Sequence, residues 1–494
     1  MTDITMDVDT KALRQRILTL AIQGKLTDQR KEDGNAQDLY NQIQEEKQKL
    51  IKEKKIKKAK PLPKIEEDEI PFEIPGNWMW VRISDLFDVA RGGSPRPIKS
   101  FLTDDPNGVN WIKIGDTEIG GKYISHVREK IKPEGVKKSR FVRSGDLLLT
   151  NSMSYGRPYI LKTDGCIHDG WLMLSPILRS LNKEFFYYLS SSQYMKQEFT
   201  KAASGAVVKN LNKDKVKAIS IPLPPLTEQK RIADKVSSLF AQLDAIDKAY
   251  EEYRELQQTM KSRLLQQAIQ GKLTDQRKED GNAQDLYNQI QEEKQRLLKE
   301  KKIKKEKTLP EITADEIPFD IPKNWMWVRL GRLITVISGV SYKKEDVCEA
   351  GVRILRGGNI QNLKVNISAS DVFLPNMYFD KTKQVKVGDV LIVASTGSKT
   401  VIGKPGYIEY ELPRTMIGAF LRICRPICKE TSTYLYRIFC SEYYRQHIRH
   451  LAQGTNINNV KEEYITKLMI PLPPLAEQKR IVEKLNKLLP LCEA

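Results

Sequence analysis

The sequence predicts an α+β fold in which two strand-rich α/β modules are separated by long antiparallel coiled-coil helices. Three observations predict it: a near-perfect internal repeat, two dissimilar stretches that alternate with the repeat, and an apolar heptad pattern between those stretches. Because the repeat is arranged circularly along the chain, we expect a pseudo-two-fold axis to relate the modules.

The repeat consists of three kinds of segment, each present twice. The first is a 38-residue stretch whose copies differ only at Lys49/Arg296 and Ile51/Leu298. The paired segments are 21–58 with 268–305, NWMWVR 77–82 with 324–329, and IPLPPL-x-EQKRI 221–232 with 470–481. One scaffold has therefore been duplicated within the chain.

The stretches between the repeated segments, residues 83–219 and 330–468, differ in sequence but share a skeleton. VRSGDLLLTNS (142–152) aligns with VKVGDVLIVAS (385–395), and WIKIGD (111–116) aligns loosely with RILRGG (353–358). Short β-branched or aromatic runs punctuated by Gly, Pro and Asn are typical of strands. These stretches are predicted to be two versions of one module.

A long helix is predicted between the modules. It begins after PLPPL with Thr227 as N-cap and ends near Gly271. Its apolar residues alternate at spacings of four and three, which is typical of a coiled coil. The predicted seam is Ile232, Val236, Leu239, Leu243, Ile246, Tyr250, Tyr253, Met260 and Leu264.

The second copy of this helix is divided between the two ends of the chain. Residues 477–494 match the helix from Glu228 onward, and residues 13–26 match its last turns. The circular duplication predicts an antiparallel helical pair and termini that are close in space. Residues 36–58 and 283–305 are predicted to be further helices.

Residues 59–76 and 306–323, which are rich in proline and acidic residues, are predicted linkers into each module. The predicted organisation is an N-terminal helical repeat with its linker, a first module, a central spacer with its linker, a second module and a C-terminal helical repeat. Their predicted bounds are 1–76, 77–220, 221–323, 324–469 and 470–494.

Composition bounds the function. The 494 residues carry 82 Lys and Arg against 63 Asp and Glu, a net charge of +19. Such an excess favours a polyanionic partner, nucleic acid first, over a basic protein without one. No apolar run approaches the ~20 residues of a membrane span. Six irregularly spaced cysteines and the absence of a signal pattern indicate a reducing, cytoplasmic setting.

Candidate chemistry is weak. Two cysteines, Cys424 and Cys428, precede His447 and His450 at spacings a zinc site could use, but the first module has no equivalent. Buried cysteines and surface histidines are the favoured interpretation, so we expect no metal site. GSKT (397–400) lacks the order of a phosphate loop. We expect the chain to perform no catalysis and to bind no cofactor itself.

Recognition of DNA fits what remains. A helix from Glu228 to Leu264 is ~55 Å long at 1.5 Å per residue, and duplex DNA presents one face every ~34 Å. Two basic modules on such a rod can contact two sites about one turn apart. Because the modules differ, we expect two different half-sites. Phosphates would supply most of the affinity and base edges the specificity.

The order and duplication of IPLPPL-x-EQKRI, EIPF-x-IP-x-NWMWVR and AIQGKL across the whole chain resemble the specificity subunit of a type I restriction–modification system. The resemblance implies that each module is a target recognition domain for half of a split DNA sequence. It implies helical repeats that dock two modification subunits, which methylate adenine N6 using S-adenosylmethionine. It also implies restriction subunits that translocate and cleave DNA using ATP and Mg.

The resemblance extends to an Arg-Gly-Gly-Ser-Pro turn beginning at Arg91, close to a family turn in which glycine permits close backbone approach. In the second module Ser338–Lys344 departs from that pattern. Polar residues after each Gly-Asp strand suit base-edge hydrogen bonds, and those in a late loop suit phosphate or base contacts. The predicted DNA contacts in the first module are Arg91, Gly92, Gly93, Ser94, Arg96, Lys99, Asn151, Ser152, Ser154, Tyr155, Arg157, Lys209 and Asn210. Those in the second are Tyr342, Lys343, Lys344, Arg356, Asn359, Ser395, Thr396, Ser398, Lys399, Asn456 and Asn458.

Two alternatives stay open at this stage. The chain could be a structural coiled-coil scaffold whose two modules bind protein, or the specificity subunit of a related nuclease–methyltransferase outside type I. Sequence-specific DNA binding discriminates the first, and the identity of the partner discriminates the second. The near-identity of residues 21–58 and 268–305 also raises the hypothesis that modules are exchanged by recombination.

Overall fold

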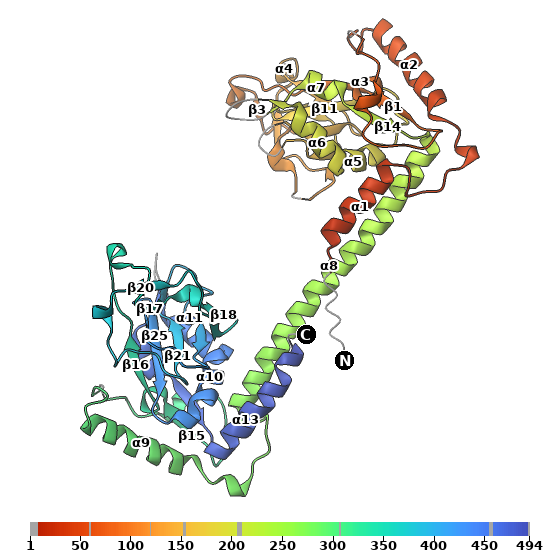
Figure 1. Ribbon diagram of the computed structural model, residues 1–494. Coiled ribbons are helices and arrows are strands. Elements are labelled where there is room, and N and C mark those ends of the chain that lie inside the picture. Colours follow the sequence, from red (N-terminus) through yellow and green to blue (C-terminus); the bar gives the residue numbers. More distant parts are fainter. Residues whose placement is uncertain are drawn as a thin grey trace. The chain divides into compact units, whose positions relative to one another are not determined.

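The computed structural model describes residues 8–58, 61–118, 120–151, 155–204, 210–305, 308–453 and 458–492. The chain forms two compact units, one of residues 6–250 and one made mainly of residues 251–494. The boundary falls inside helix α8 (Leu226–Ile269), so each unit holds one half of that helix and one module (Figure 1). The predicted α+β class, with a long helix between two modules, is confirmed.

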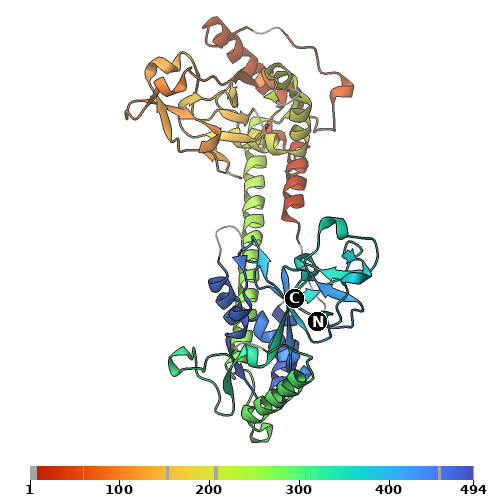
Figure 2. The same cartoon turned by 90° about the vertical axis from the view of Figure 1, so that its left-hand side faces the viewer.

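In the first unit, helix α1 (Thr10–Ile22) lies alongside the first half of α8 in Figures 1 and 2. Arg14 donates to the carboxylates of Asp244 and Asp247, at 2.8 Å each, and its guanidinium lies over the Phe240 ring. Thr27, beyond the end of α1, reaches Glu228 at the start of α8. Residue numbers therefore rise along one helix as they fall along the other, and the predicted antiparallel pairing is confirmed in this unit.

The second unit contains the matching pair in the opposite chain order. Helix α13 (Leu475–Leu488) packs its buried residues Ile481 and Leu485 into the same core as Leu265 and Ile269 of α8. Each unit thus combines one copy of the helix start with one copy of the helix end, as the circular duplication predicts. The predicted proximity of the termini involves residues 1–7 and 493–494, which lie outside the described residues.

Three predicted helix boundaries need correction. Helix α8 begins at Leu226, so Thr227 lies within its first turn instead of capping it, and its hydroxyl donates to the Asp33 carbonyl. Helices α2 (Ala36–Lys52) and α9 (Ala283–Lys299) end at the first lysine of the basic run KEKKIKK, because Lys54 and Lys301 adopt positive φ angles of 57° and 55°. The predicted end of α8 near Gly271 agrees with Ile269 and with a φ of 69° at this glycine.

Each module is inserted between two short strands of the scaffold. Strand β1 (Met79–Arg82) pairs with β14 (Ser220–Leu223), and β15 (Met326–Arg329) pairs with β27 (Met469–Leu472), antiparallel and in matching register. One further backbone hydrogen bond closes each insertion point, from Ile83 N to Ile219 O at 3.0 Å and from Leu330 N to Leu468 O at 2.8 Å. Residues 83–219 and 330–468 are therefore attached in the same way.

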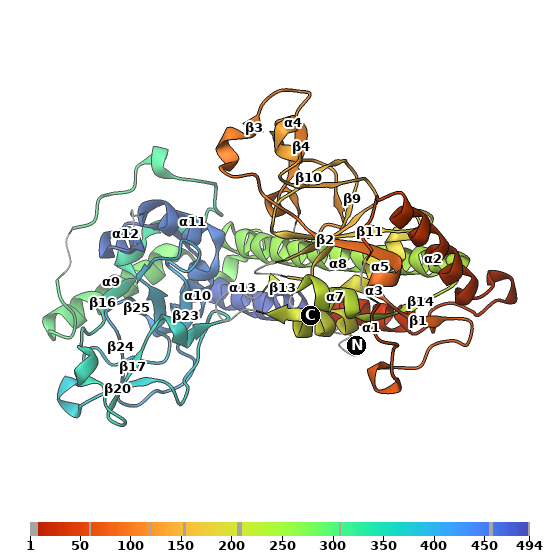
Figure 3. The ribbon, with the colours of Figure 1, turned by 90° about the horizontal axis from the view of Figure 1, so that it is seen from above.

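The first module contains two five-stranded sheets, one on the helical core and one farther out. The inner sheet has the order β2-β11-β8-β9-β5 and the outer sheet the order β3-β6-β4-β10-β7. Figure 3 shows β3, β4 and β10 together with α4, away from α7. The inner strands are β2 (Phe87–Arg91), β5 (Tyr123–Ile124), β8 (Leu147–Thr150), β9 (Pro158–Leu161) and β11 (Trp171–Pro176). The outer strands are β3 (Leu102–Thr103), β4 (Val109–Ile112), β6 (Glu129–Ile131), β7 (Arg140–Val142) and β10 (Gly165–Ile167).

The second module repeats this plan with a six-stranded sheet, β16-β25-β21-β23-β19-β18, and a three-stranded sheet, β20-β17-β24. Figure 3 places β17, β20 and β24 together, away from α11 and α12. The larger sheet comprises β16 (Ile334–Ser338), β18 (Ile360–Gln361), β19 (Lys364–Val365), β21 (Val390–Val393), β23 (Pro405–Tyr407) and β25 (Leu421–Pro426). The smaller one comprises β17 (Val352–Leu355), β20 (Val372–Leu374) and β24 (Thr415–Ile417).

Short helices cover the inner sheets and complete each core. Their apolar faces are buried, with Phe185 and Phe199 in the first unit and Tyr434 and Phe439 in the second all at most 1% exposed. In the first module they are α3 (Ile83–Leu86), α5 (Lys183–Ser191), α6 (Gln193–Ala202) and α7 (Lys213–Ala218), whereas α4 (Pro133–Val136) packs on the outer sheet. In the second they are α10 (Ser432–Cys440), α11 (Glu442–Leu451) and α12 (Glu462–Thr466).

A buried glutamate anchors each module to the scaffold helices. The Glu228 carboxylate is fully buried and accepts hydrogen bonds from Trp78 Nε1 at 2.8 Å, Gln29 Nε2 at 2.7 Å and Thr27 Oγ1 at 3.2 Å. The Glu477 carboxylate accepts the corresponding bonds from Trp325, Gln276 and Thr274, at 2.7, 2.7 and 3.0 Å. All these residues belong to the repeated segments, which explains why the two anchors have the same geometry.

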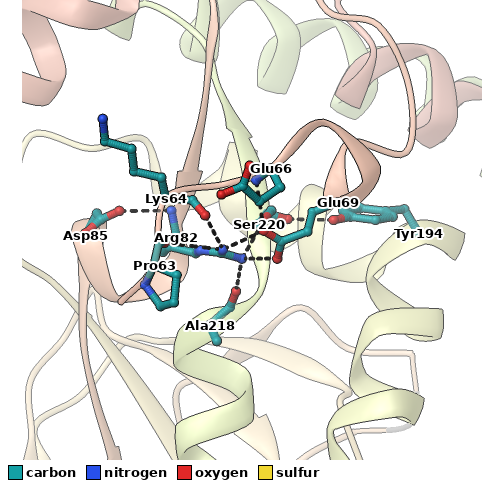
Figure 4. Close-up of polar contacts among 9 residues, drawn as sticks. All are labelled: Pro63, Lys64, Glu66, Glu69, Arg82, Asp85, Tyr194, Ala218 and Ser220. Atoms are coloured by element: carbon teal, nitrogen blue, oxygen red, sulfur yellow. Dashed lines mark hydrogen bonds and ion pairs between the residues drawn. The ribbon is translucent and has the colours of Figure 1, made fainter. Parts of the chain in front are cut away.

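A buried arginine holds each predicted linker against the pair of short strands that flanks the module, β1 with β14 or β15 with β27. Arg82 donates to both oxygens of Glu69 at 2.8 Å, to Ala218 O and to Ser220 Oγ (Figure 4). This guanidinium holds the pKa of Glu69 below its usual value. Arg329 and Glu316 repeat the arrangement. The linkers are therefore fixed by charge-assisted bonds and are not plain spacers.

The predicted heptad seam is buried only in part. Ile232 and Val236 are fully buried and Leu243 is 7% exposed, whereas Ile246, Tyr253 and Met260 are 37 to 55% exposed. Leu239, Tyr250 and Leu264 are half-buried. The seam therefore packs where α8 lies beside α1 or carries a module, and its middle turns present apolar side chains to solvent.

Candidate nucleic-acid interface

In both modules, four chain segments meet where the inner and outer sheets adjoin. Strand β4 runs parallel to β10, and β17 runs parallel to β24, so the carboxyl ends of each pair lie together. The turn after β2 or β16 and the turn after β8 or β21 reach the same place through backbone hydrogen bonds. We name this place the convergent edge of each module. Most of the predicted DNA contacts lie on it or beside it.

In the first module a close backbone contact sets the edge. A Cβ added at Gly92 would lie 2.1 Å from the His168 carbonyl oxygen, so only glycine fits there. Gly92 N donates to Trp171 O, and Gly93 N donates to Ile167 O. The predicted close approach at this glycine is thus to the chain's own backbone. That contact leaves the side chains of Arg91 and Arg96 exposed at the rim.

Asp169 is the centre of the polar network at this edge. Its carboxylate accepts hydrogen bonds from Ser94 Oγ at 3.1 Å and faces His168 Nε2 at 2.9 Å. The Arg96 guanidinium lies 3.6 Å from the other carboxylate oxygen of Asp169. The backbone carbonyl of Asp169 accepts a hydrogen bond from Arg91 Nε at 3.3 Å. One carboxylate residue therefore organises Arg91 and Arg96, two of the arginines predicted to contact DNA.

Asn151 supports this network from inside. Its side chain is fully buried and donates to the Asp169 carbonyl, while its backbone N–H donates to Gly170 O at 2.7 Å. Its Oδ1 atom is buried with no hydrogen-bond partner among the described residues. Asn151 was predicted to contact a base edge, but its burial makes it a positioning residue for the turn that carries Asp169.

The second module builds the same edge with different side chains. A Cβ at Gly339 would lie 2.1 Å from Gly418 O, and Val340 N donates to Ile417 O. Gly339 therefore occupies the place of Gly92, although the surrounding letters differ. Gly418 N donates to Leu355 O, which brings exposed Arg356 to the edge. No carboxylate stands in the place of Asp169, where the second module has Ala419.

The turn after β21 is held by a short strand pair. Strand β22 (Ser395–Thr396) pairs with β26 (Asn458–Asn459), and Asn458 Nδ2 donates to Thr396 O. Asn458 is 4% exposed, so it braces this turn and does not present its amide to a ligand. Buried Arg445 donates to the carbonyls of Thr400 and Ile402 and fixes the loop that carries exposed Lys399.

The remaining predicted contacts divide by burial. Asn359 is 8% exposed and ties Arg356 N to Asp371, so it acts within the fold. Tyr342 and Tyr155 are half-buried against apolar cores, and their contacts with DNA stay predictions. Exposed cations are Lys99, Arg157, Lys343 and Lys344; half-buried polar residues are Asn210, Ser395, Thr396 and Ser398. Ser152, Ser154, Lys209 and Asn456 lie outside the described residues.

Two residues of the edge were missed from sequence, the half-buried Asp169 and the exposed Phe420. Both sit in the turn between the last outer and the last inner strand, β10–β11 in the first module and β24–β25 in the second. Finding this turn required the parallel pairs Ile112 with Ile167 and Leu355 with Ile417, which join residues far apart in the chain. The exchange of His168-Asp169-Gly170 for Gly418-Ala419-Phe420 hides the correspondence in the letters.

The cysteine and histidine residues considered as metal ligands in the sequence do not form a metal-binding cluster among the described residues. Among the residues that the structure describes, no three His, Cys, Asp or Glu side chains are grouped as metal ligands. Cys424 is buried, and burial raises the pKa of the Cys428 thiol to about 11. His447 Nε2 lies 3.0 Å from Tyr464 O. No helix in the described parts of the chain is long and apolar enough to span a bilayer.

Comparison with known proteins agrees with this architecture. Residues 75–253 and 322–492 each match the family model of the type I restriction modification DNA specificity domain. The specificity subunit of the type I restriction enzyme EcoAI from Escherichia coli is 27% identical over 98% of this chain and 89% of its own length.

Two solved structures share the fold. A chain from a type I restriction–modification assembly is 20% identical, with a TM-score of 0.60 over 86% of this chain and 93% of its own length. The HsdS subunit from Thermoanaerobacter tengcongensis is 18% identical, with a TM-score of 0.50 over 86% and 92%. Because two family domains together cover most of its length, this chain belongs to the type I restriction–modification DNA specificity family.

Proposed function

We propose that this chain is the non-catalytic, sequence-specific DNA-recognition subunit of a type I restriction–modification complex. Each module reads one half of an asymmetric, bipartite target through its convergent edge. The observation that carries this proposal is the pair of edges, which have the same backbone and different exposed side chains. Arg91 and Arg96 rim one, and Arg356 and Lys399 lie at or beside the other.

The side chains at the edges suit DNA. Arginine can bond guanine O6 and N7 or a phosphate, and hydroxyl groups accept or donate at base edges. Exposed lysines near the edges, with a net charge of +19 over the chain, supply sequence-independent attraction to the phosphate backbone. A scaffold for two protein partners would not require cations gathered around a rigid turn in both modules.

The catalytic steps belong to partners in this proposal. Two modification subunits dock on the scaffold helices and methylate adenine N6 with S-adenosylmethionine, and restriction subunits translocate and cleave DNA with ATP and Mg. Tyr253, Leu256 and Met260 support such docking, because they leave apolar surface exposed on the middle turns of α8. The proposed setting is the cytoplasm, where DNA and these partners meet.

Genome-wide mapping of adenine methylation tests the proposal. Cells carrying the chain and its modification partner should methylate a split, asymmetric motif that is absent when the chain is deleted. If no motif depends on the chain while partner expression is verified, the DNA-recognition proposal fails and the protein-scaffold alternative gains. A motif methylated through a partner of another architecture would point to the alternative outside type I.

A further inference from the structure

Phe420 projects from the convergent edge of the second module. Its side chain is 67% exposed, although Ile417 and Leu421 on either side of the turn are fully buried. The turn itself is fixed, because the Phe420 carbonyl accepts hydrogen bonds from Ala394 N at 2.8 Å and Ser395 N at 3.2 Å. A rigid backbone therefore presents a large apolar ring to solvent at the centre of the proposed DNA-reading surface.

The corresponding position of the first module carries no side chain. There Gly170 accepts the matching bond from Asn151 N at 2.7 Å. Two neighbouring positions change in the same direction, since Ala394 stands in the place of Asn151 and Ala419 in the place of Asp169. The first edge is thus polar around a carboxylate, and the second is apolar around an aromatic ring.

The residues around Phe420 indicate what the ring meets. Arg356 follows strand β17, which is paired with β24, and the backbone N–H of Ser395 donates to the Phe420 carbonyl. Lys399 is exposed on the loop that follows Ser395. An apolar group that shares an edge with cationic and hydroxyl-bearing residues fits the major groove of DNA, where phosphates flank base edges. The apolar feature of that groove is the C5-methyl group of thymine, which phenylalanine is able to contact.

We infer that Phe420 is a specificity-determining residue of the second half-site that contacts a thymine methyl group. The inference rests on the proposed function and goes beyond it by naming the residue and the base chemistry. Arg356, at the same convergent edge, supplies a polar contact to an adjacent base or phosphate. The first module, with Gly170 at this place, reads its half-site without such an apolar contact.

The test uses the chain assembled with its modification subunit and duplexes carrying the motif methylated by the wild-type complex. Phe420→Ala should weaken binding about tenfold, within the range of one specific base contact. Phe420→Leu, which keeps an apolar side chain, should retain most of the affinity. The control is Met377→Ala, because Met377 is 88% exposed in the same module but follows the strand end opposite the edge.

Replacing thymines of the second half-site with uracil, one at a time, identifies the contact. One replacement should weaken wild-type binding several-fold and should not weaken Phe420→Ala further, because both changes remove the same contact. Replacements in the first half-site should act equally on both proteins. Unchanged affinity and an unchanged methylated motif for Phe420→Ala would overturn the inference, as would a wild-type complex indifferent to every uracil. If the wild-type complex methylates no motif at all, the failure lies in the proposed function.

Discussion

The two units of this chain are nearly identical where they hold their modules and dissimilar where the modules meet solvent. Glu228 and Glu477 accept the same three hydrogen bonds, and Arg82 and Arg329 grip the same linker. At the convergent edges, by contrast, the position of Asp169 in the first module holds Ala419 in the second, and the position of Gly170 holds Phe420. The difference teaches that attachment and recognition are separate properties of the chain, because side chains at the edge change while the backbone bonds that build it do not.

The largest effect should come from removing an anchor. Glu228→Ala removes the buried acceptor of three hydrogen bonds, one of them from the buried Trp78 Nε1, and should destabilise the first unit by about 3 kcal/mol. Glu477→Ala should destabilise the second unit by a similar amount, because its bonds are equivalent. Hydrogen exchange measured by mass spectrometry on the full chain reads each unit separately. Exposed Glu45→Ala on α2 is the control, and loss of protection in both units from one anchor substitution would contradict their independence.

The linker clamps, which are the ion pairs of Arg82 with Glu69 and of Arg329 with Glu316, should give the next largest effect on stability. Arg82→Lys keeps the charge but loses the forked contact to Glu69, and it should cost about 2 kcal/mol and raise exchange of residues 61–69. Arg329→Lys should likewise raise exchange of residues 311–316. Exchange of residues 330–340 that rises with Arg82→Lys would show that the clamps do not act locally.

The same clamp predicts a pH dependence. Because Arg82 lowers the pKa of Glu69 from its usual 4.5, the ion pair contributes its full stability above that value. The contribution is lost as the pH falls through the lower, folded-state pKa. Protection of residues 61–69 should therefore decline on acidification below about pH 4.5, and Arg82→Lys should reduce this decline.

A smaller effect, confined to one half-site, should follow Asp169→Asn. The substitution removes the charge facing Arg96 and His168, and it should weaken recognition of the first half-site about tenfold while increasing binding to unrelated DNA. Methylation of substrates altered in one half at a time measures both changes. Asp104→Asn, the same charge change at an exposed residue that follows β3 and takes no part in the Asp169 network, is the control. Relaxed reading of the second half-site would break the assignment of edges to halves.

The smallest effect should come from single exposed cations. Arg91→Ala and Lys399→Ala should each weaken binding to one half-site only. If they contact phosphate, each should lower the slope of log affinity against log salt by about one without altering sequence preference. Titration at several salt concentrations separates the two cases. No change in affinity or slope would place both residues outside the interface.

The repeat made much of the scaffold predictable. Because NWMWVR and IPLPPL flank each module, the insertion points and the antiparallel helices could be predicted from sequence, and the heptad located α8. Thr227 was placed outside the helix because threonine is a frequent N-cap, whereas the helix begins one residue earlier. The basic runs after Lys52 and Lys299 continue a helical composition, and only a positive φ ends the helix.

The recognition surface was predictable only in part. Glycine at position 92 and the exposed arginines beside it carry local signals. The burial of Asn151, Asn359 and Asn458 depends on bonds to distant segments. A polar residue after a strand in the sequence therefore does not reveal whether it contacts DNA or holds the fold together. Asp169 and Phe420 reach the edge through long-range parallel pairing, which no local pattern in this sequence reports.

A module replacement tests the central claim most directly. Residues 83–219 would be inserted in place of 330–468, so that both strand pairs of the scaffold, β1 with β14 and β15 with β27, hold the first module. Adenine methylation would then be mapped with the modification partner present. The account predicts a symmetric motif that repeats the first half-site in inverted orientation. Methylation of the original asymmetric motif, or of none by a chain that folds and assembles normally, would contradict the claim that each module reads its half-site independently.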